Sequence, residues 1–297
     1  DAVKFQTFKT EHYVNQLDSA RFKRLKSFEL TFSEFEELSN LAHSRGLMFI
    51  STPFDLASAD FLNNIVDSYK IASGDNTFYP LIKEVALTGK PMIVSTGISH
   101  TVQVEKTVEF IKKTWSNSNI IGQLALLHCV SSYPVPDDQA NLRSIQCLSG
   151  IFEGPVGYSD HTLGIDAVVL ATALGAQIVE KHFTLDRNFS DFRDHQLSAD
   201  PAEMKNLVRR IRTTTSMLGE NQKRVERCEN DLVTAVRRSI VAGKDMSAGH
   251  RISMSDLTWL RPAGGLVPGK EEVLIGKALK RKVSFGEQLS VADVEVI

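Results

Sequence analysis

The sequence has few of the features that mark secreted, membrane or nucleic-acid-binding proteins. Its three cysteines, Cys129, Cys147 and Cys228, are odd in number and unpatterned, so we expect no disulfide framework and a reducing, cytoplasmic location. No apolar run reaches the length of a membrane span, so we expect no membrane partner. The net charge of −2 argues against nucleic acid as a partner, and local groups must hold any anionic ligand.

The composition is that of an ordinary globular protein. Hydrophobic residues make up 42% and charged residues 24% of the chain, so a sizeable core can be buried. A length of 297 residues suits one large domain, or one large domain followed by a small one. The fold class must therefore be sought in the order of the apolar segments.

Short apolar runs, rich in β-branched or aromatic residues, alternate with helix-like segments along residues 1–185. The seven runs cover residues 2–8, 47–54, 68–73, 91–97, 124–130, 155–160 and 176–185. One helix-like segment, residues 33–46, begins at Ser33 with Glu36 three residues later, which is the spacing of a capping box. Strands that alternate with helices favour an α/β protein with a parallel sheet.

Two α/β architectures fit this alternation. Seven β/α units are one fewer than a TIM (β/α)8 barrel contains. A doubly wound sheet is the alternative, but it usually has fewer strands and a glycine-rich first turn, and the sequence has no GxGxxG motif. The count therefore favours the barrel, in which ligand groups gather where the strands end.

All seven apolar runs end in polar residues. The candidates at these ends are Lys4, Gln6, Thr52, Lys70, Ser73, Asp75, Ser95, Ser131, Tyr133, Ser159, His161, Glu180 and His182. Two lysines with several hydroxyls and glycine-adjacent amides can hold a phosphate or a carboxylate. Lysines at a rim and serines that cap helices are the structural alternatives. For Glu180 we expect only a role in supporting the other residues of the site.

Two histidines bracket the apolar segment between the last two runs. If His161 and His182 end neighbouring parallel strands, their backbones lie roughly 5 Å apart and both rings can reach one divalent ion. Two imidazoles with oxygen ligands suit Mn²⁺, with Mg²⁺ or Co²⁺ as alternatives, and such a metal can polarise an aldehyde oxygen. Asp75 and Asp194 are candidate acid–base or hydroxyl-binding groups. A hydrogen-bonded structural role is the alternative for each histidine.

Seven motifs together resemble one enzyme family. AVKFQTFK, STPFD, YKIASGD, STG, LLHCVSSYP, GYSDHTLG and EKHFTLD occur in the order and spacing of the sialic acid (N-acetylneuraminate) synthases, which include legionaminic and pseudaminic acid synthases. The resemblance implies a TIM barrel, a divalent metal ion and a C-terminal antifreeze-like (SAF) domain. It also implies condensation of phosphoenolpyruvate with an N-acetylated hexose such as N-acetylmannosamine, giving a nonulosonic acid and phosphate.

The resemblance also implies a role for each motif residue. Lys4 and Lys70 resemble phosphoenolpyruvate binders, with Thr52, Ser73, Ser95 and Ser159 as their partners, and His161 and His182 resemble metal ligands; Gln6, Tyr133 and Asp194 match sugar-contacting positions. Asp75 stands where members have Asp or Glu, and Ser131 where some have Asn. Because the family has an earlier strand with a Glu-containing motif, we expect the first β/α unit to be missing from this chain.

The last quarter of the chain carries an internal repeat. Residues 246–257 and 283–294 align at an offset of 37, which suggests a small, pseudo-twofold, loop-rich domain. We predict a barrel over residues 1–220, a charged linker over residues 221–236 and the SAF domain over residues 237–297. The resemblance implies that Arg261, in WLRPAGGLVP, reaches the partner subunit's barrel in a homodimer and contacts the sugar's N-acyl group; a solvent-exposed arginine is the alternative.

Two other functions remain open at this point. One is a Schiff-base pyruvate aldolase that uses Lys70 or Lys181 as its nucleophile. The other is a non-catalytic glycan- or ice-binding protein, which the antifreeze-like repeat suggests. The three functions differ in chemistry, since only the synthase releases phosphate from phosphoenolpyruvate when an amino sugar is added.

Overall fold

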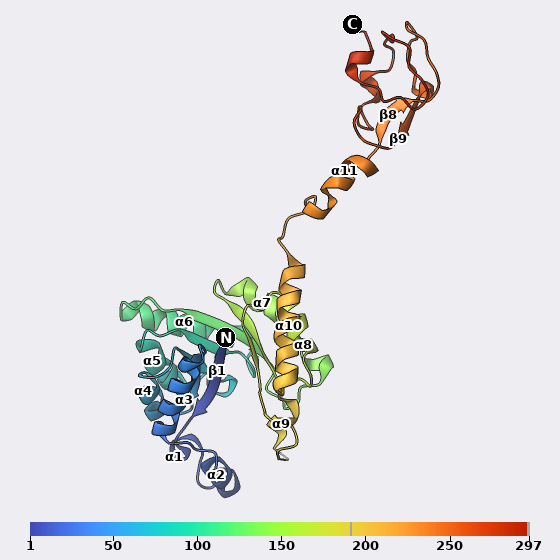
Figure 1. The fold of residues 1–297 in the computed structure, drawn as a ribbon. Coiled ribbons are helices and arrows are strands. Elements are labelled where there is room, and N and C mark those ends of the chain that lie inside the picture. The colour runs from blue at the N-terminus through green and yellow to red at the C-terminus, as the bar shows by residue number, and fades with distance from the viewer. Residues whose placement is uncertain (191, 296–297) are drawn as a thin grey trace. The chain divides into compact units, whose positions relative to one another are not determined.

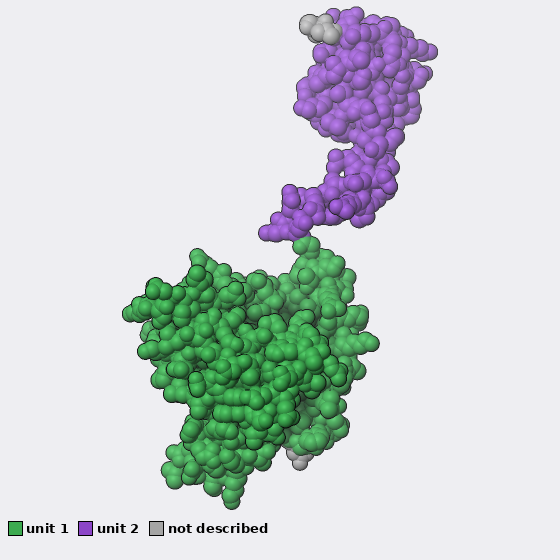
Figure 2. Space-filling model, turned by 60° about the vertical axis from the view of Figure 1, so that its left-hand side comes forward, with its two compact units in different colours: residues 1–219 green, residues 220–297 purple. Residues whose placement is uncertain are grey.

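The chain divides into two compact units. A computed structural model describes residues 1–190 and 192–295, and the units comprise residues 1–219 and 220–297 (Figure 2). Each unit has its own hydrophobic core. In the part of the chain that the structure describes, no helix is both long and apolar enough to cross a membrane.

The first unit is built on a parallel sheet whose strands follow one another in chain order (Figure 1). Within the described residues the strands are β1 (Ala2–Thr7), β2 (Met48–Pro53), β3 (Ser68–Ile71), β4 (Met92–Ser95), β5 (Leu124–Cys129), β6 (Val156–Asp160) and β7 (Val179–Lys181). Each predicted run contains one of them, so the predicted α/β class and parallel sheet are confirmed. The sheet curls into a half-barrel. The curl brings Lys4 on edge strand β1 within 3.0 Å of Glu180 on edge strand β7. An eight-stranded barrel stays a prediction.

Helices surround this curled sheet (Figure 1). They are α1 (Thr10–Tyr13), α2 (Ser19–Lys26), α3 (Phe32–Ser44), α4 (Leu56–Leu62), α5 (Tyr79–Leu87), α6 (Thr101–Asn117), α7 (Ser144–Ile151), α8 (Asp166–Ala173), α9 (Arg193–Leu197) and α10 (Pro201–Leu218), with 3₁₀ turns η1 (Ser73–Asp75) and η2 (Asp137–Gln139). Short helices α1, α2 and α9 lie at the edge where strands end, and α3 to α8 pack outside the sheet (Figure 1).

The start of α3 corrects one prediction. The capping box is formed by Thr31 and Glu34, not by Ser33 and Glu36. Thr31 Oγ1 accepts from the Glu34 backbone at 3.2 Å, and Glu34 accepts from the Thr31 backbone at 2.7 Å. Starting two residues earlier places Phe32 in the helix, where its ring stacks on that of Phe61 with centroids 4.0 Å apart. Apolar packing therefore selects between two similar capping sequences.

The alternation of side chains along each strand separates the core from the site. On β3, Tyr69 and Ile71 are fully buried, and the Tyr69 hydroxyl donates to the carbonyl of Ala59 in α4. Lys70 lies between them and points to the opposite face, the inside of the curl. The outer face of the sheet thus packs against the helices, and the inner face presents polar groups.

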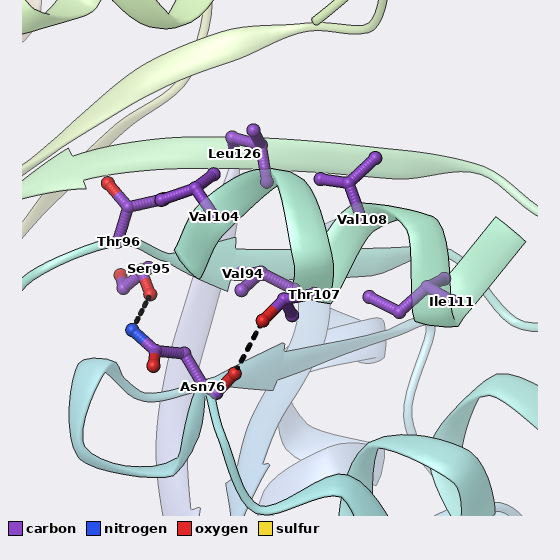
Figure 3. A pocket seen from close by; sticks show the side chains of 9 residues that line it. All are labelled: Asn76, Val94, Ser95, Thr96, Val104, Thr107, Val108, Ile111 and Leu126. Carbon is purple, nitrogen blue, oxygen red and sulfur yellow. Dashed lines mark hydrogen bonds between the residues drawn. The ribbon is translucent and has the colours of Figure 1, made fainter. Parts of the chain in front are cut away.

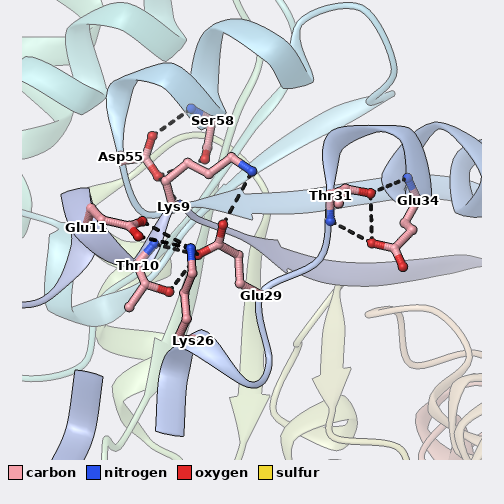
Figure 4. Close-up of polar contacts among 9 residues, drawn as sticks. All are labelled: Lys9, Thr10, Glu11, Lys26, Glu29, Thr31, Glu34, Asp55 and Ser58. Atoms are coloured by element: carbon pink, nitrogen blue, oxygen red, sulfur yellow. Dashed lines mark hydrogen bonds and ion pairs between the residues drawn. The ribbon is translucent and has the colours of Figure 1, made fainter. Parts of the chain in front are cut away.

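A polar cluster joins the exits of β1 and β2 (Figure 4). Glu29, in the loop before α3, accepts from the backbone N–H and the hydroxyl of Thr10 at 2.9 and 2.7 Å. Burial would raise the pKa of Glu29, but the bonds from Thr10 and Lys26 outweigh it and lower the pKa to about 2. Asp55 accepts from the Lys9 backbone at 2.8 Å. These bonds fix the loops beside the strand ends.

The second unit contains the predicted repeat. Its elements are η3 (Arg227–Glu229), α11 (Asn230–Val236), β8 (Ser239–Ala242), η4 (Met254–Asp256), β9 (Leu257–Leu260), η5 (Glu271–Val273) and η6 (Val291–Asp293). Ser253 with Asp256 and Ser290 with Asp293 form matching capping boxes at the offset of 37. Equivalent residues Met246 and Val283 pair with each other antiparallel, as a local twofold axis requires. The loop-rich repeat is confirmed, whereas the segment expected to be a linker contains η3 and α11.

Candidate active site

Two lysines and one glutamate meet inside the curled sheet. Lys4 lies on β1, Lys70 on β3 and Glu180 on β7. Glu180 Oε1 lies 3.0 Å from Lys4 Nζ, and Glu180 Oε2 lies 3.4 Å from Lys70 Nζ. Lys70 Nζ also donates to Ser95 Oγ at 2.5 Å, at the end of β4. One carboxylate therefore holds two ammonium groups together, and the cluster retains positive charge for an anionic ligand.

Burial and charge act against each other in this cluster. Burial lowers the pKa of Lys70, whose side chain is 6% exposed, and the carboxylate of Glu180 offsets part of that effect. Burial would raise the pKa of Glu180, but Lys4 and Lys70 outweigh it and hold that pKa well below its usual range. Glu180 is therefore ionised at neutral pH and favours the charged form of Lys70.

The two histidines lie side by side. His161 directly follows β6 and His182 directly follows β7. The residues before them, Asp160 and Lys181, are register partners, and the two imidazole centroids are 5.2 Å apart. This is the placement that matched strand ends predict. Tyr133 packs against both rings, with centroid distances of 4.1 Å to His161 and 5.9 Å to His182.

Hydrogen bonds decide which nitrogen of His161 can bind a ligand. Its Nδ1 lies 2.9 Å from the carbonyl oxygen of Val130, and a carbonyl can only accept, so Nδ1 carries the hydrogen and Nε2 keeps its lone pair. Cys129 Sγ lies 3.8 Å from the same Nδ1. Burial lowers the pKa of His161, but the contacts with Cys129 and Val130 raise it more. A proton therefore competes with any ligand at Nε2.

His182 is neutral at neutral pH. Burial, together with the ammonium group of Lys4, lowers its pKa to about 3. Its Nδ1 lies 3.9 Å from Asp194 Oδ2, on α9. In residues 1–190 and 192–295 no three His, Cys, Asp or Glu side chains gather as metal ligands, so a metal here would need oxygen ligands from substrate and water. Two imidazoles with oxygen ligands fit a first-row divalent ion.

Gly97 brings two of the predicted hydroxyls together. A Cβ atom at Gly97 would lie 2.6 Å from both Ser73 Oγ and Ser131 Oγ, so no larger residue fits without displacing them. The backbone N–H of Gly97 donates to Ser73 Oγ at 3.1 Å. Ser73, Gly97 and Ser131 follow β3, β4 and β5, so this contact joins the exits of three neighbouring strands.

Asp75 lies in the turn after β3, and its neighbour Asn76 anchors that turn (Figure 3). Asn76 Nδ2 lies 3.2 Å from the Gly97 carbonyl and 3.4 Å from the Ser95 carbonyl. The hydroxyl of Thr107 on α6 donates to the Asn76 carbonyl at 2.8 Å. Burial raises the pKa of Asp75 to about 6. Asp75 can therefore accept or release a proton near neutral pH.

Two cavities of the first unit lie beside this site. The small pocket of Figure 3 has walls made mainly of valine, isoleucine and leucine side chains from β4, β5 and α6, so it belongs to the core. A larger cavity of about 420 Å³ lies between the loops after β4 and β5, and no charged residue is among its described lining. Charge that can bind an anion is instead concentrated on Lys4 and Lys70.

The other predicted residues lie at strand ends or in the second unit. Gln6 and Thr52 are register partners on β1 and β2. Ser159, on β6, is buried and pairs in register with Glu180. Arg261 belongs to the second unit, where it is exposed directly after β9.

Sequence reasoning missed part of the site. From sequence, Glu180 was expected only to support the site, yet it forms ion pairs with both lysines. The available signal was its spacing of two residues from His182, which places both side chains on one face of the strand. Asn76 and Gly97 were not identified. Cys129 was counted as one of three unpaired cysteines and not as a site residue, and the structure places its sulfur 3.8 Å from Nδ1 of His161.

Comparisons with known proteins identify the family to which the chain belongs. Residues 1–223 match the NeuB family, and residues 237–295 match the SAF domain. An uncharacterized protein of Methanocaldococcus jannaschii is 44% identical over 94% of this chain and 81% of its own length. An N,N'-diacetyllegionaminic acid synthase of Legionella pneumophila is 39% identical over 99% of this chain and 86% of its own length.

A solved structure has the same fold. The N-acetylneuraminic acid (sialic acid) synthetase of Leptospira borgpetersenii, crystallised with citrate, superposes with a TM-score of 0.73 at 34% identity. The match covers 78% of this chain and 79% of that chain. Since the family match extends over most of the chain and the relatives align over most of their length, the chain belongs to the NeuB family and carries a SAF domain.

Proposed function

We propose that this protein condenses phosphoenolpyruvate with an N-acetylated hexose, N-acetylmannosamine or a related sugar, to give a nonulosonic acid and phosphate. The Legionella and Leptospira relatives are named as synthases of such acids. The observation that carries the proposal is the meeting of the Lys4–Glu180–Lys70 cluster with the paired imidazoles of His161 and His182.

In this proposal the lysine cluster binds phosphoenolpyruvate. Lys4 and Lys70 supply two ammonium groups, and Ser95 is already within hydrogen-bond distance of Lys70. Hydroxyls at the neighbouring exits complete the cradle: Thr52, Ser73, Ser131 and Ser159. Fixed cations and hydroxyls bind a carboxylate or phosphate strongly because they need no rearrangement when the ligand arrives.

His161 and His182 would hold the divalent metal, with Mn²⁺ preferred and Mg²⁺ or Co²⁺ as alternatives. The Nε2 lone pair of His161 and the neutral ring of His182 fit this role. When bound, such a metal supplies Lewis-acid polarisation of an aldehyde oxygen.

The sugar would lie beside the histidines in its open-chain form. Gln6, Tyr133 and Asp194 would contact it, since Tyr133 and Asp194 already lie against the two imidazoles. Carbon 3 of phosphoenolpyruvate attacks the aldehyde carbon, water adds at carbon 2, and phosphate leaves. Asp75, with a pKa raised to about 6 by burial, would take the proton of that water.

The second unit would complete the site of another subunit. We propose a homodimer in which Arg261 contacts the N-acyl group of the sugar in the partner's barrel, because a guanidinium is a planar charged donor suited to a carbonyl oxygen. A twofold dimer makes this exchange reciprocal. The free thiols of Cys129, Cys147 and Cys228 support a cytoplasmic location.

Sugar-dependent phosphate release tests the proposal. The intact polypeptide is given phosphoenolpyruvate, Mn²⁺ and each of a set of N-acetylated hexoses, with and without a 6-phosphate, and phosphate and the acid product are measured. Lys70→Met should lower kcat/KM for phosphoenolpyruvate about 10²–10³-fold, as loss of a preorganised charged donor does. Lys106→Met, on the exposed face of α6, is the matched control and should change nothing.

Two outcomes would contradict the proposal. In the first, phosphate is released at the same rate without any sugar, which would make the enzyme a phosphatase. In the second outcome, borohydride would trap pyruvate covalently on a lysine, which would support a Schiff-base aldolase that uses Lys70 or Lys181.

A further inference from the structure

The residues that directly precede the two histidines form a buried ion pair. Asp160 ends β6, Lys181 ends β7, and the two are register partners. Lys181 Nζ donates to Asp160 Oδ2 at 2.7 Å, and the side chains are 2% and 0% exposed. Because side chains alternate along a strand, this pair lies on the opposite face of the sheet from His161 and His182.

The pair also binds the backbone directly after His161. Asp160 Oδ1 accepts from the N–H of Thr162 at 2.8 Å and from the hydroxyl of Tyr158 at 3.0 Å. Lys181 Nζ donates to the carbonyl of Thr162 at 2.6 Å. The backbone that follows His161 is therefore bonded at the Thr162 N–H to Asp160 and at the Thr162 carbonyl to Lys181, the residue before His182.

Stability alone is a weak reason for this arrangement. Two charges lose their hydration when they are buried, and a well-packed apolar pair can often replace a buried ion pair without loss of stability. An apolar pair would still join β6 to β7, but it could not hydrogen-bond to the N–H and carbonyl of Thr162. The feature that only the ion pair supplies is the fixed geometry between the two histidines.

We infer that Asp160 and Lys181 are positioning residues that set the separation and orientation of the imidazoles of His161 and His182 toward a divalent metal ion. This inference rests on the proposed function, in which those histidines are the metal ligands. It also assigns the Lys181 ammonium to Asp160 and Thr162 rather than to a Schiff base. Partners that orient metal ligands typically change metal affinity 10–100-fold when they are removed.

Mn²⁺ affinity, measured on the full chain by electron paramagnetic resonance of the free ion, separates positioning from stability. Lys181→Met and Asp160→Asn should each weaken Mn²⁺ binding at least tenfold and lower the Tm. The double variant Asp160→Leu with Lys181→Met should regain much of the Tm, yet its Mn²⁺ binding should stay at least tenfold weaker. Tyr69→Phe removes a buried hydrogen bond on β3 and is the matched control: its Tm should fall while its Mn²⁺ affinity stays within twofold.

The inference is overturned if the double variant recovers both stability and Mn²⁺ affinity, because the pair would then serve only to join two strands. Should the double variant not fold, Asp160→Asn, the mildest change, decides: wild-type Mn²⁺ affinity in its folded form overturns the inference. His161→Ala is measured in parallel. Unchanged Mn²⁺ binding in that variant refutes the two-histidine site of the proposed function, whereas its loss beside unchanged binding in the ion-pair variants refutes only the positioning role.

Discussion

Replacing Glu180 with glutamine removes one negative charge from between two lysines and keeps the side chain's size. At 3.0 and 3.4 Å, and with an effective dielectric constant of about 20, each attraction is worth about 5 kcal/mol before desolvation is subtracted. Loss of one partner of a buried pair costs about 3–5 kcal/mol. Because Lys4 is 24% exposed, we expect the lower end, about 3 kcal/mol.

Thermal unfolding of the intact polypeptide measures this cost. For a unit of about 200 residues, 1 kcal/mol corresponds to about 2–4 °C, so Glu180→Gln should lower the Tm by roughly 6–12 °C. Saturating phosphoenolpyruvate should shrink this difference, because the ligand supplies the negative charge that the carboxylate supplied. Glu105→Gln, exposed on α6, makes the same chemical change and should leave the Tm unchanged.

The pH dependence gives a second check on the same variant. The two lysines hold the folded-state pKa of Glu180 below its unfolded value of about 4.3, so its stabilisation is complete above that pH. The Tm difference should therefore persist from pH 7 to 5 and narrow as pH falls below about 4. A difference under 2 °C at pH 7, or one that phosphoenolpyruvate leaves unchanged, would refute the assignment of Glu180 as the partner of both lysines.

Four further tests address the metal, Asp75 and Arg261. A chelator should abolish phosphate release, and Mn²⁺ should restore it in the wild type but not in His182→Ala; recovery in that variant would remove His182 from the ligand set. Burial raises the pKa of Asp75 to about 6, and Asp75 can act as a base only when ionised, so kcat/KM should fall about tenfold per pH unit below 6. If Asp75→Asn shows the same fall at acid pH, the titrating group is another residue. Because the pKa of Asp75 is higher in the folded than in the unfolded protein, ionisation of Asp75 should lower the free energy of unfolding by at most roughly 3 kcal/mol as the pH rises from 4 to 6. Urea titrations measure this free energy, and a difference between wild type and Asp75→Asn that does not change from pH 4 to 6 would contradict the raised pKa. Mixing inactive Arg261→Ala and His182→Ala should restore activity at roughly a quarter of sites if Arg261 acts on the partner subunit; no recovery despite subunit exchange would place its action within its own chain or nowhere.

The strands and the histidine pair were predictable because they depend on local pattern and on counting. Apolar runs bounded by turns locate strands, and two ends 21 residues apart on neighbouring strands meet whatever the exact curvature of the sheet. The start of α3 was wrong by two residues, because Thr31 with Glu34 and Ser33 with Glu36 have the same spacing. The observed start is the one that packs Phe32 on Phe61, and that contact joins α3 to α4, which sequence spacing does not reveal.

The two lysines were candidates from sequence, but the ion pairs that join both to Glu180 could not be predicted, since they depend on the curvature of the sheet. Lys4 and Glu180 lie on opposite edge strands and meet only because the sheet curls. The consecutive residues Glu180, Lys181 and His182 would suit a solvated strand by composition, yet all three are largely removed from water, and the Lys181 side chain is only 2% exposed. A shielded polar strand is stable only if each side chain has a partner, and those partners come from β1, β3 and β6. The same contacts that allow β7 to be partly buried also arrange its side chains for chemistry, so the fold and the site are specified by one set of ion pairs.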